Sequence, residues 1–354
     1  MCTLGIDVSK NKIDLCLLTA GPGGKKKHKV LTNEPAVARK VVDWLNAQKC
    51  VPESVTVVLE ATGIYHENLA YGLHEAGVSV CMANPCRVRE FAHGMDILNK
   101  NDAVDAFVLA CYGELKSPAV WVPPSPEVRK LRALLRQRDA LREDVQRTVN
   151  RLEKANSTST PQEVIRSLER TKSWLNEELA RIEKLITDHT DNDPGLKADL
   201  DLLKSIKGVK DQVGREMLAL LKDGTFKSAS QVAAYLGLTP VEKTSGSSVR
   251  GRPHMSKTGP SGVRAKLYVA ALTASRWNKQ AKAIYERLVA KGKAKKAALG
   301  ARWNKQAKAI YERLVAKGKA KKAALGAVMR KLVHLCFGVL KTRLPWDENY
   351  VATA

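Results

Sequence analysis

Runs of alternating hydrophobic and polar residues open the chain. Residues 3–31 hold three such runs, TLGIDV, KIDLCLL and KKHKVL, joined by a short polar connection and a Gly-Pro-Gly-Gly turn. Runs of this kind are typical of β-strands, so they predict an antiparallel meander. The spacing then predicts a helix over about 34–47, a buried strand that ends at Glu60, a helix over about 64–76 and another strand, VSVCMANP. Three strands followed by alternating helix and strand predict an α/β domain of the ribonuclease H-like, or RuvC-like, fold class.

A proline-rich segment, WVPPSPEV, interrupts this pattern with Pro123, Pro124 and Pro126. Proline cannot continue a helix, so the segment predicts the end of the first domain. The next two stretches, about 127–155 and 162–189, are charged, with leucine and isoleucine at helical spacing. They predict a helical hairpin with a coiled-coil seam, which is either an ordinary bundle within one chain or a dimer interface.

The remainder of the chain predicts short helices. After Gly195 the apolar runs shorten to LLKSIKGV, REMLALLKD and SASQVAAYLGL. A chain of 354 residues also exceeds the size that one hydrophobic core normally supports. We therefore expect three parts: a RuvC-like domain over residues 1–122, a linker and coiled-coil hairpin over 123–195, and a mainly α C-terminal domain over 196–354.

One 26-residue segment occurs twice in the C-terminal part. Residues 276–301 read RWNKQAKAIYERLVAKGKAKKAALGA, and residues 302–327 repeat these letters without one difference. Solenoid repeats keep a pattern while their surface residues drift, and at least three are normally needed to bury a core. The identity therefore indicates a recent duplication or a cloning artefact.

Basic residues outnumber acidic ones by a wide margin. Lysine and arginine total 60 against 36 aspartates and glutamates, which gives a formal net charge of +24. This surplus favours a polyanionic partner, and no apolar run is expected to reach the roughly 20 residues of a membrane-spanning helix. We therefore expect nucleic acid as the partner and no membrane. With no visible secretion signal and seven scattered cysteines, a cytoplasmic protein with reduced thiols is expected.

Four acidic residues have a setting that suits a metal site. Asp7 closes the first predicted strand, Glu60 closes the later buried strand, and Asp102 and Asp105 share one helical face in KNDAVDAFVLACYGEL. Clustered carboxylates repel one another unless cations cancel their charge, and two Mg²⁺ ions would also stabilise the attacking and leaving oxygens of a phosphodiester. The alternative is that the helical pair only favours a helix start and that the other two are surface acids.

A second candidate site is the loop TSGSSVRGRPHMSKTG. Serine is a weak nucleophile unless a base, a metal or an electropositive surrounding activates it. Ser245, Ser247 and Ser248 are rivals, because any hydroxyl of a flexible loop could reach a phosphate. Arginine can grip two phosphate oxygens and hold them for attack. The basic residues that we assign to nucleic-acid binding are Arg250, Arg252 and Lys257. The alternative is a glycine-serine loop without chemistry.

These motifs resemble a known family in both order and setting. The succession GIDVSKNKIDL, VVLEATGIYHENLA, NPCRVREFA and LNKNDAVDA is similar to the RuvC-like domain of DEDD transposases of the IS110 insertion-sequence family, also called bridge-RNA-guided recombinases. The similarity continues through SIKGV, AAYLGLTP, the serine loop and GAVMRKLVHLCFGVLKT, so it covers nearly the whole chain. The resemblance implies a transposase with a DEDD metal site and a C-terminal transposase domain.

The resemblance also implies specific roles and partners. Ser245 would be the nucleophile and would hold the DNA end as a covalent phosphoserine. The cofactors would be Mg²⁺, with Mn²⁺ as a substitute, and a non-coding guide RNA encoded by the element. The protein would act on donor and target DNA at the bacterial nucleoid, as a tetramer built from two dimers. The DEDD set would be Asp7, Glu60, Asp102 and Asp105.

The chain differs from the family pattern at one segment, and two alternative functions stay open. The family carries one copy of the segment that this chain repeats at residues 302–327. One alternative is a RuvC-like nuclease or junction resolvase, in which the acids drive attack by water and no covalent intermediate forms. The other is an inactive protein that only binds RNA and DNA. The sequence leaves open whether acids and serine act together within one protomer or between two.

Overall fold

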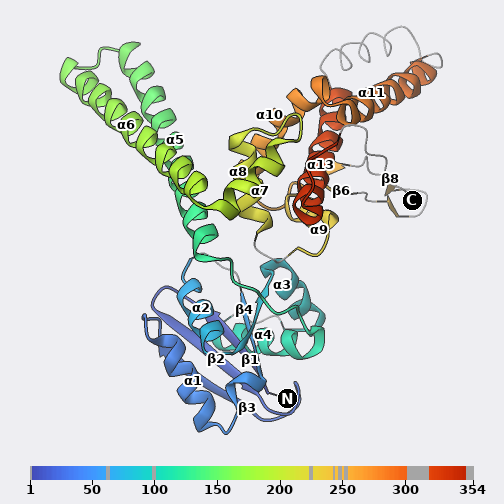
Figure 1. Ribbon diagram of the computed structural model, residues 1–354. Coiled ribbons are helices and arrows are strands. Elements are labelled where there is room, and N and C mark those ends of the chain that lie inside the picture. The colour runs from blue at the N-terminus through green and yellow to red at the C-terminus, as the bar shows by residue number, and fades with distance from the viewer. Residues whose placement is uncertain are drawn as a thin grey trace. The chain divides into compact units, whose positions relative to one another are not determined.

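The chain forms two compact units in a computed structural model that describes residues 2–60, 64–97, 101–222, 226–241, 244–245, 249–250, 254–300 and 319–347. The N-terminal unit is Met1–Pro123 and the C-terminal unit is Pro124–Ala354 (Figure 1). The division into three parts at residues 122 and 195 stays a prediction.

A five-stranded mixed sheet forms the centre of the N-terminal unit (Figure 1). Its strands stand in the order β3-β2-β1-β4-β5. β1 pairs antiparallel with β2 and β2 with β3, whereas β4 runs parallel to both β1 and β5. This is the strand order of the ribonuclease H-like fold, so the predicted fold class is confirmed. The strands are β1 (Cys2–Val8), β2 (Lys12–Leu18), β3 (Lys26–Thr32), β4 (Val55–Glu60) and β5 (Ser79–Ala83).

Helices cover the two faces of this sheet. On one face, Leu4 and Ile6 of β1 share a core with Val41 of α1 and Leu73 of α2. On the other face lies α4, which carries Ala106 and Ala110 into a separate cluster. Side chains alternate between the faces of a strand, so the face of each strand residue follows from its neighbours. The helices are α1 (Val37–Ala47), α2 (Glu67–Glu75), α3 (Pro85–Gly94) and α4 (Asp102–Lys116), with a 3-10 turn at Pro52–Ser54.

Helix α4 approaches β1 closely at Gly5. A Cβ atom on Gly5 would stand 2.1 Å from the carbonyl oxygen of Ala106, so any larger residue would push the helix away. Two residues earlier on the same face, the Thr3 hydroxyl donates to Glu114 Oε2 of α4 at 2.6 Å. Because side chains of one face recur every second residue, Asp7 also faces α4.

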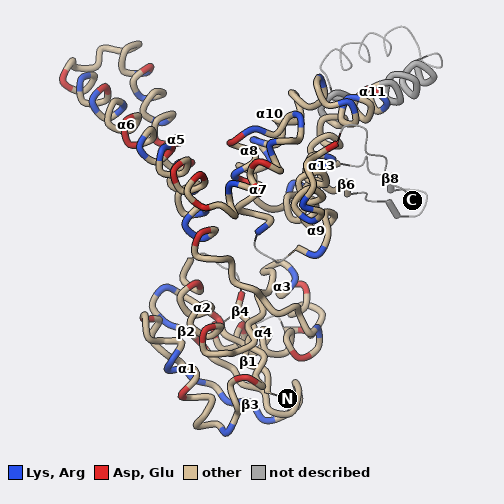
Figure 2. The backbone as a smooth tube through the Cα atoms, viewed as in Figure 1, with Lys and Arg blue, Asp and Glu red and all other residues tan. Residues whose placement is uncertain are grey.

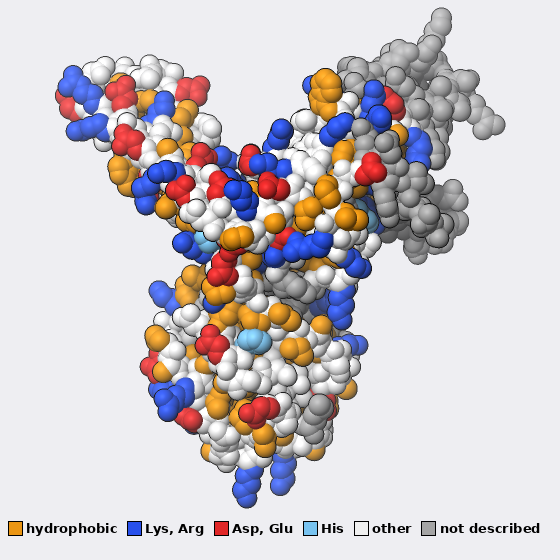
Figure 3. All heavy atoms as spheres, in the orientation of Figure 1, with side chains coloured by type: hydrophobic (Ala, Val, Ile, Leu, Met, Phe, Trp, Pro, Cys, Tyr) orange, Lys and Arg blue, Asp and Glu red, His pale blue; other side chains and the backbone are white. Residues whose placement is uncertain are grey.

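The C-terminal unit begins with a long hairpin of α5 (Pro126–Asn156) and α6 (Gln162–Asn192), drawn in green in Figure 1. Basic and acidic residues occur all along the hairpin (Figure 2), and side chains of both signs lie on the face of it that Figure 3 shows. The predicted helical hairpin is therefore confirmed, and its role as a dimer interface stays a prediction. The buried seam residues include Leu135 and Leu141 of α5 and Leu175, Ile182 and Ile186 of α6.

The base of the hairpin and the helices that follow share one hydrophobic core. A buried ion cluster reinforces this contact. Arg138 of α5 pairs with Glu216 of α8 at 2.6 Å, and Lys266 of α10 pairs with Glu216 and Asp139 at 2.5 Å each. The helices are α7 (Pro194–Lys204), α8 (Asp211–Leu221), α9 (Ala229–Tyr235), α10 (Ser261–Trp277), α11 (Lys279–Gly300) and α13 (Lys319–Thr342).

Helix α13 corrects one sequence expectation. Its part Ala323–Thr342 is long and apolar enough, by length and composition, to cross a membrane, whereas we expected no such run. Arg330 and Lys331 divide the apolar residues into two shorter runs, so the sequence has no uninterrupted apolar stretch of this length. Leu332 and Val333 lie fully buried in the core of the C-terminal unit, so the apolar face of this helix has a structural role there.

Each of the two identical segments has buried residues in its described part. In the first copy, Asn278 is fully buried, donates to the Lys207 carbonyl at 3.2 Å and accepts from the Ala281 amide at 3.1 Å. In the second copy, Ala324 and Leu325 are buried. Described residues of both copies are therefore buried in the C-terminal unit.

We predict that deleting residues 302–327 preserves the fold. Ala298 and Leu299 would take the places of Ala324 and Leu325, because the letters are identical. Removing a 26-residue insertion also relieves a loop-closure cost of about 3 kcal/mol at most, so Tm should rise by roughly a few degrees. Thermal unfolding followed by circular dichroism measures this. A shortened protein that aggregates or melts lower would show that both copies are needed.

Candidate active site

Two of the predicted acids lie at the carboxyl ends of neighbouring parallel strands. Asp7 is near the end of β1 and Glu60 is the last residue of β4. In the ladder between them Ile6 pairs with Leu59, so the two acids follow as the next register position. The carboxyl ends of parallel strands are where open α/β sheets bind their ligands.

The other two acids stand on the first turn of α4. Asp102 and Asp105 begin this helix, and the Asn101 side chain caps it by accepting from the Val104 amide at 2.9 Å. The next residue, Ala106, lies against Gly5 of β1. The first turn of α4 is thereby held beside the carboxyl end of β1, where Asp7 projects.

The pKa of Asp7 is raised, in part by the other acids near it. Burial, which is the largest cause, and the charges of four other carboxylates together raise its pKa from 3.8 to about 6. Each of these acids must therefore lie within electrostatic reach of Asp7. The four are, in order of effect, Asp105, Asp102, Glu60 and Asp14.

Asp14 and Lys12 are members of this cluster that the sequence analysis missed. Asp14 pairs with Asp7 across the antiparallel ladder of β1 and β2 and is almost fully buried. The Lys12 ammonium lies 3.0 Å from Asp14 Oδ2 and 2.7 Å from Asp102 Oδ2. The signal was present in the alternation of KIDLCLL, which places an acid on the same face as buried Cys16 and Leu18.

The donor set fits a hard divalent cation. All of the candidate ligands are carboxylate oxygens, which Mg²⁺ and Mn²⁺ prefer, and a cation would offset the repulsion that holds up the Asp7 pKa. Within the described ranges, no three Asp, Glu, His or Cys side chains yet converge to enclose an ion. Instead, Lys12 supplies a positive charge to Asp102 and Asp14.

The predicted nucleophile belongs to a β-hairpin of the C-terminal unit. Ser245 is the last residue of β7 and pairs with Val249 of β8. The side chains of Ser245 and Arg250, and all of Ser247, Ser248 and Arg252, lie outside the described residues. Lys257 is described and exposed, with a left-handed φ of 57°. The short strands are β6 (Pro240–Val241), β7 (Thr244–Ser245), β8 (Val249–Arg250) and β9 (His254–Met255).

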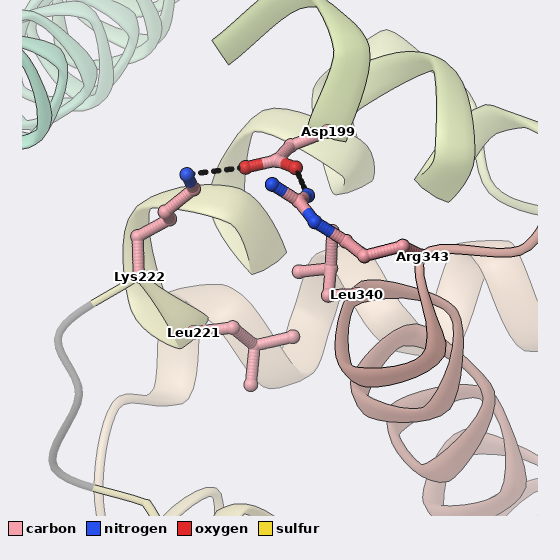
Figure 4. Close-up of a pocket in the computed structure, with 5 residues that line it drawn as sticks. All are labelled: Asp199, Leu221, Lys222, Leu340 and Arg343. Atoms are coloured by element: carbon pink, nitrogen blue, oxygen red, sulfur yellow. Dashed lines mark hydrogen bonds and ion pairs between the residues drawn. The ribbon is translucent and has the colours of Figure 1, made fainter. Parts of the chain in front are cut away.

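A separate charged pocket of about 300 Å³ lies among the helices of the same unit (Figure 4). The fully buried Asp199 carboxylate pairs with Lys222 Nζ at 2.5 Å and with the Arg343 guanidinium. Removing either cation would leave a buried charge under-compensated, which is strongly destabilising. This triad joins α7 to the ends of α8 and α13, and we assign it a structural role.

Both parts of the chain are similar to transposases. Residues 4–157 match the model of a DEDD transposase family of the IS110 type, and residues 200–286 match the transposase IS116/IS110/IS902 family. Pilin gene-inverting proteins of Moraxella lacunata and Moraxella bovis are each 26% identical over 350 residues, which is 98% of this chain and 98% of theirs. An uncharacterised 43.6 kDa protein of insertion element IS110 from Streptomyces coelicolor is 30% identical over 99 residues, 28% of this chain and 24% of that protein.

Two solved structures of Thermus thermophilus RuvC are similar to part of this chain. The complex with a Holliday junction substrate is 16% identical with a TM-score of 0.27, and it covers 34% of this chain and 99% of that one. A second RuvC structure is 18% identical with a TM-score of 0.26 and the same coverage. The fold assignment therefore stands on the strand order described above.

We predict that Asp7→Asn stabilises the metal-free protein. The folded-state pKa is raised, so the stability that Asp7 contributes is complete below pH 3.8 and is lost as the pH rises to about 6. At pH 7.5 a neutral side chain should add about 1–2 kcal/mol after solvent screening, and so raise Tm by a few degrees. Thermal unfolding in EDTA at pH 7.5 and at pH 4 measures the gain, which should vanish at pH 4.

The matched control is Asp43→Asn, which removes an exposed acid of α1. It should leave Tm unchanged in EDTA. Adding Mg²⁺ should stabilise the unmodified protein and the control more than Asp7→Asn. A lower Tm for Asp7→Asn in EDTA would mean that Asp7 is stabilised as an anion by contacts within the fold.

Proposed function

This chain belongs to the IS110 family of transposases, enzymes with a RuvC-like nuclease domain, and on that premise we propose that it recombines DNA through metal-binding carboxylates and a serine nucleophile guided by RNA. The observation that carries the proposal is that Asp7, Glu60 and the first turn of α4 lie at the same end of the sheet, within electrostatic reach of one another. A DEDD domain implies a divalent metal. We assign its ligands to Asp7, Glu60, Asp102 and Asp105.

The chain's own residues have separate tasks in this scheme. The four carboxylates would hold two Mg²⁺ ions, which would supply charge stabilisation to a reacting phosphodiester. Lys12 balances the negative charge of Asp102 and Asp14 in the metal-free state. Arg250, Arg252 and Lys257 hold the DNA phosphates, because a serine hydroxyl needs an electropositive surrounding to attack a phosphodiester.

The covalent step conserves phosphodiester energy. Ser245 Oγ forms a bond to the scissile phosphorus, the bond from phosphorus to the leaving sugar oxygen breaks, and the serine proton passes to that oxygen through solvent. In the reverse direction, a sugar hydroxyl of the new strand attacks the phosphoserine, and Ser245 regains its proton. One ester bond forms for each one broken, so the exchange needs no ATP.

The pilin gene-inverting proteins support this scheme over simple hydrolysis. They align with this chain along 98% of its length, and their name describes inversion of a gene. Inversion must rejoin every end that it cuts, whereas attack by water leaves free ends. A covalent intermediate meets that need, so we favour it over the RuvC-like nuclease or resolvase alternative.

Nucleic acids are the proposed partners. A net charge of +24 suits donor DNA, target DNA and a guide RNA encoded by the element. Aromatic residues make up only 5% of the chain, so backbone and shape contacts should dominate RNA binding. We propose that the α5–α6 hairpin joins protomers into dimers and that two dimers form a tetramer at the bacterial nucleoid.

We predict that Ser245→Ala abolishes the covalent protein–DNA adduct. Loss of the nucleophile should lower adduct formation by roughly 10³-fold or more, while DNA binding stays intact. Incubation with labelled DNA, RNA and Mg²⁺, followed by denaturing electrophoresis, measures the adduct. Asp7→Ala should also lose the adduct, since the metal site would be incomplete.

Three serine variants serve as comparisons. Ser247→Ala and Ser248→Ala remove the rival hydroxyls, and Ser256→Ala removes a hydroxyl next to β9; all three should keep the adduct. Cleavage by Ser245→Ala that releases free ends would support the nuclease alternative instead. If neither the full chain nor the form lacking residues 302–327 cuts, although both bind RNA, the protein is a binding module.

We predict that recombination depends on a co-purifying RNA. Nuclease treatment followed by removal of the nuclease should abolish recombination, and adding back the RNA should restore it. Changing the RNA's DNA-complementary stretch should move the cleavage site to the matching sequence, because base pairing would supply the specificity. Sequencing the cleaved ends measures this. Unchanged cleavage sites without RNA would contradict guidance.

A further inference from the structure

The hairpin that carries Ser245 leaves the core through a narrow stem, which we define as residues 236–241 and 254–259. Pro240 pairs with Met255 and Val241 with His254. Below these pairs, the Ser256 amide donates to the Thr239 carbonyl at 3.0 Å. The two chain segments are therefore held together where they enter and leave the core.

The side chain of Arg264 in α10 donates hydrogen bonds to backbone carbonyls of this stem. Its Nη1 atom donates to the Thr258 carbonyl at 2.6 Å, to the Gly259 carbonyl at 2.9 Å and to the Leu236 carbonyl at 3.3 Å. One charged nitrogen thus joins the end of α9 to the returning segment of the hairpin. Hydrogen bonds from a charged donor are stronger than those between neutral groups.

Two glycines of the stem allow backbone contact without side chains between the segments. A Cβ atom on Gly237 would lie 2.3 Å from the Thr258 carbonyl oxygen, and one on Gly259 would lie 1.9 Å from the Tyr235 carbonyl oxygen. Both glycines have a positive φ, of 66° and 75°. Any residue larger than glycine at either position would therefore clash with the backbone of the opposite segment.

Lys257 lies between these contacts in a left-handed conformation, which is costly for a residue with a Cβ atom. Its amide donates to the Gly237 carbonyl at 3.1 Å, and its side chain is exposed. The surrounding contacts hold this backbone conformation. A cationic side chain is thereby presented to solvent from a fixed backbone at the base of the serine hairpin.

We propose that Arg264 is a positioning residue for the transposition reaction. It fixes the stem, and through the stem it sets the direction of the hairpin that carries Ser245 and the position of Lys257. The inference rests on the proposed function, since it gives Ser245 the role of nucleophile. The Nη1 atom is directed at backbone carbonyls, so Arg264 acts through the hairpin and is not assigned a phosphate contact.

The test compares Arg264→Ala and Arg264→Lys with Arg276→Ala, an exposed arginine near the end of the same helix. Amide hydrogen exchange over residues 254–259 should rise at least tenfold in Arg264→Ala, because local opening becomes easier. Adduct formation should fall by about 10²-fold, as expected when a reacting group is misplaced by about 1 Å. DNA binding should change by less than about twofold. Arg264→Lys should lie between, and Arg276→Ala should match the unmodified protein.

Gly237→Ala loosens the stem through different atoms and should reproduce both effects. Loss of the adduct together with DNA binding, while stem exchange stays unchanged, would overturn the proposal, because Arg264 would then contact DNA. A loosened stem with a full adduct rate would overturn it as well. If Ser245→Ala still forms an adduct, the proposed nucleophile fails, and the exchange data separate that result from a failure of the stem contacts.

Discussion

The close approach of α4 to β1 at Gly5 is the constraint on which the candidate metal site depends. With no side chain on Gly5, the carbonyl of Ala106 can lie where a Cβ atom would otherwise stand. This contact determines the height of the helix above the sheet. Asp102 and Asp105 are on the helical turn just before Ala106. Their distance from Asp7 therefore depends on the absence of a Cβ atom at Gly5. A wider spacing would separate the acids and lower their mutual repulsion, but it would also remove the site.

The gathered acids make the N-terminal unit less stable than its hydrophobic core would allow. Burial and neighbouring charge raise the pKa of Asp7 to about 6, so at neutral pH the fold holds an anion that it disfavours. Lys12 offsets part of this repulsion by pairing with Asp102 and Asp14. A site that binds cations strongly should be unstable without them, since the same repulsion drives both effects.

The parts that the sequence predicted well are those in which one local pattern decides the structure. Alternation in TLGIDV and KIDLCLL predicted β1 and β2, and the heptad spacing predicted the α5–α6 hairpin. Asp14 was missed because the alternation of KIDLCLL shows only which face of the strand it occupies; its place at the site follows from its pairing with Asp7 on the neighbouring strand. Arg264 was missed for the same reason, since its three carbonyl partners come from α9 and from the far side of the hairpin.

A carboxylate metal site by itself does not determine whether an enzyme hydrolyses DNA or exchanges DNA strands. Metal-bound acids stabilise the charge on a phosphodiester whether water or a hydroxyl attacks it. The outcome therefore depends on which nucleophile is held in line with phosphorus, and a hydroxyl competes with water at about 55 M only if it is positioned to a fraction of an ångström. The acids stand on strands and on a helix whose place is set by core packing. In the proposed mechanism Ser245 stands on a two-stranded hairpin, so its position has to be fixed by the stem, and the backbone contacts of Arg264, Gly237 and Gly259 hold that stem in place.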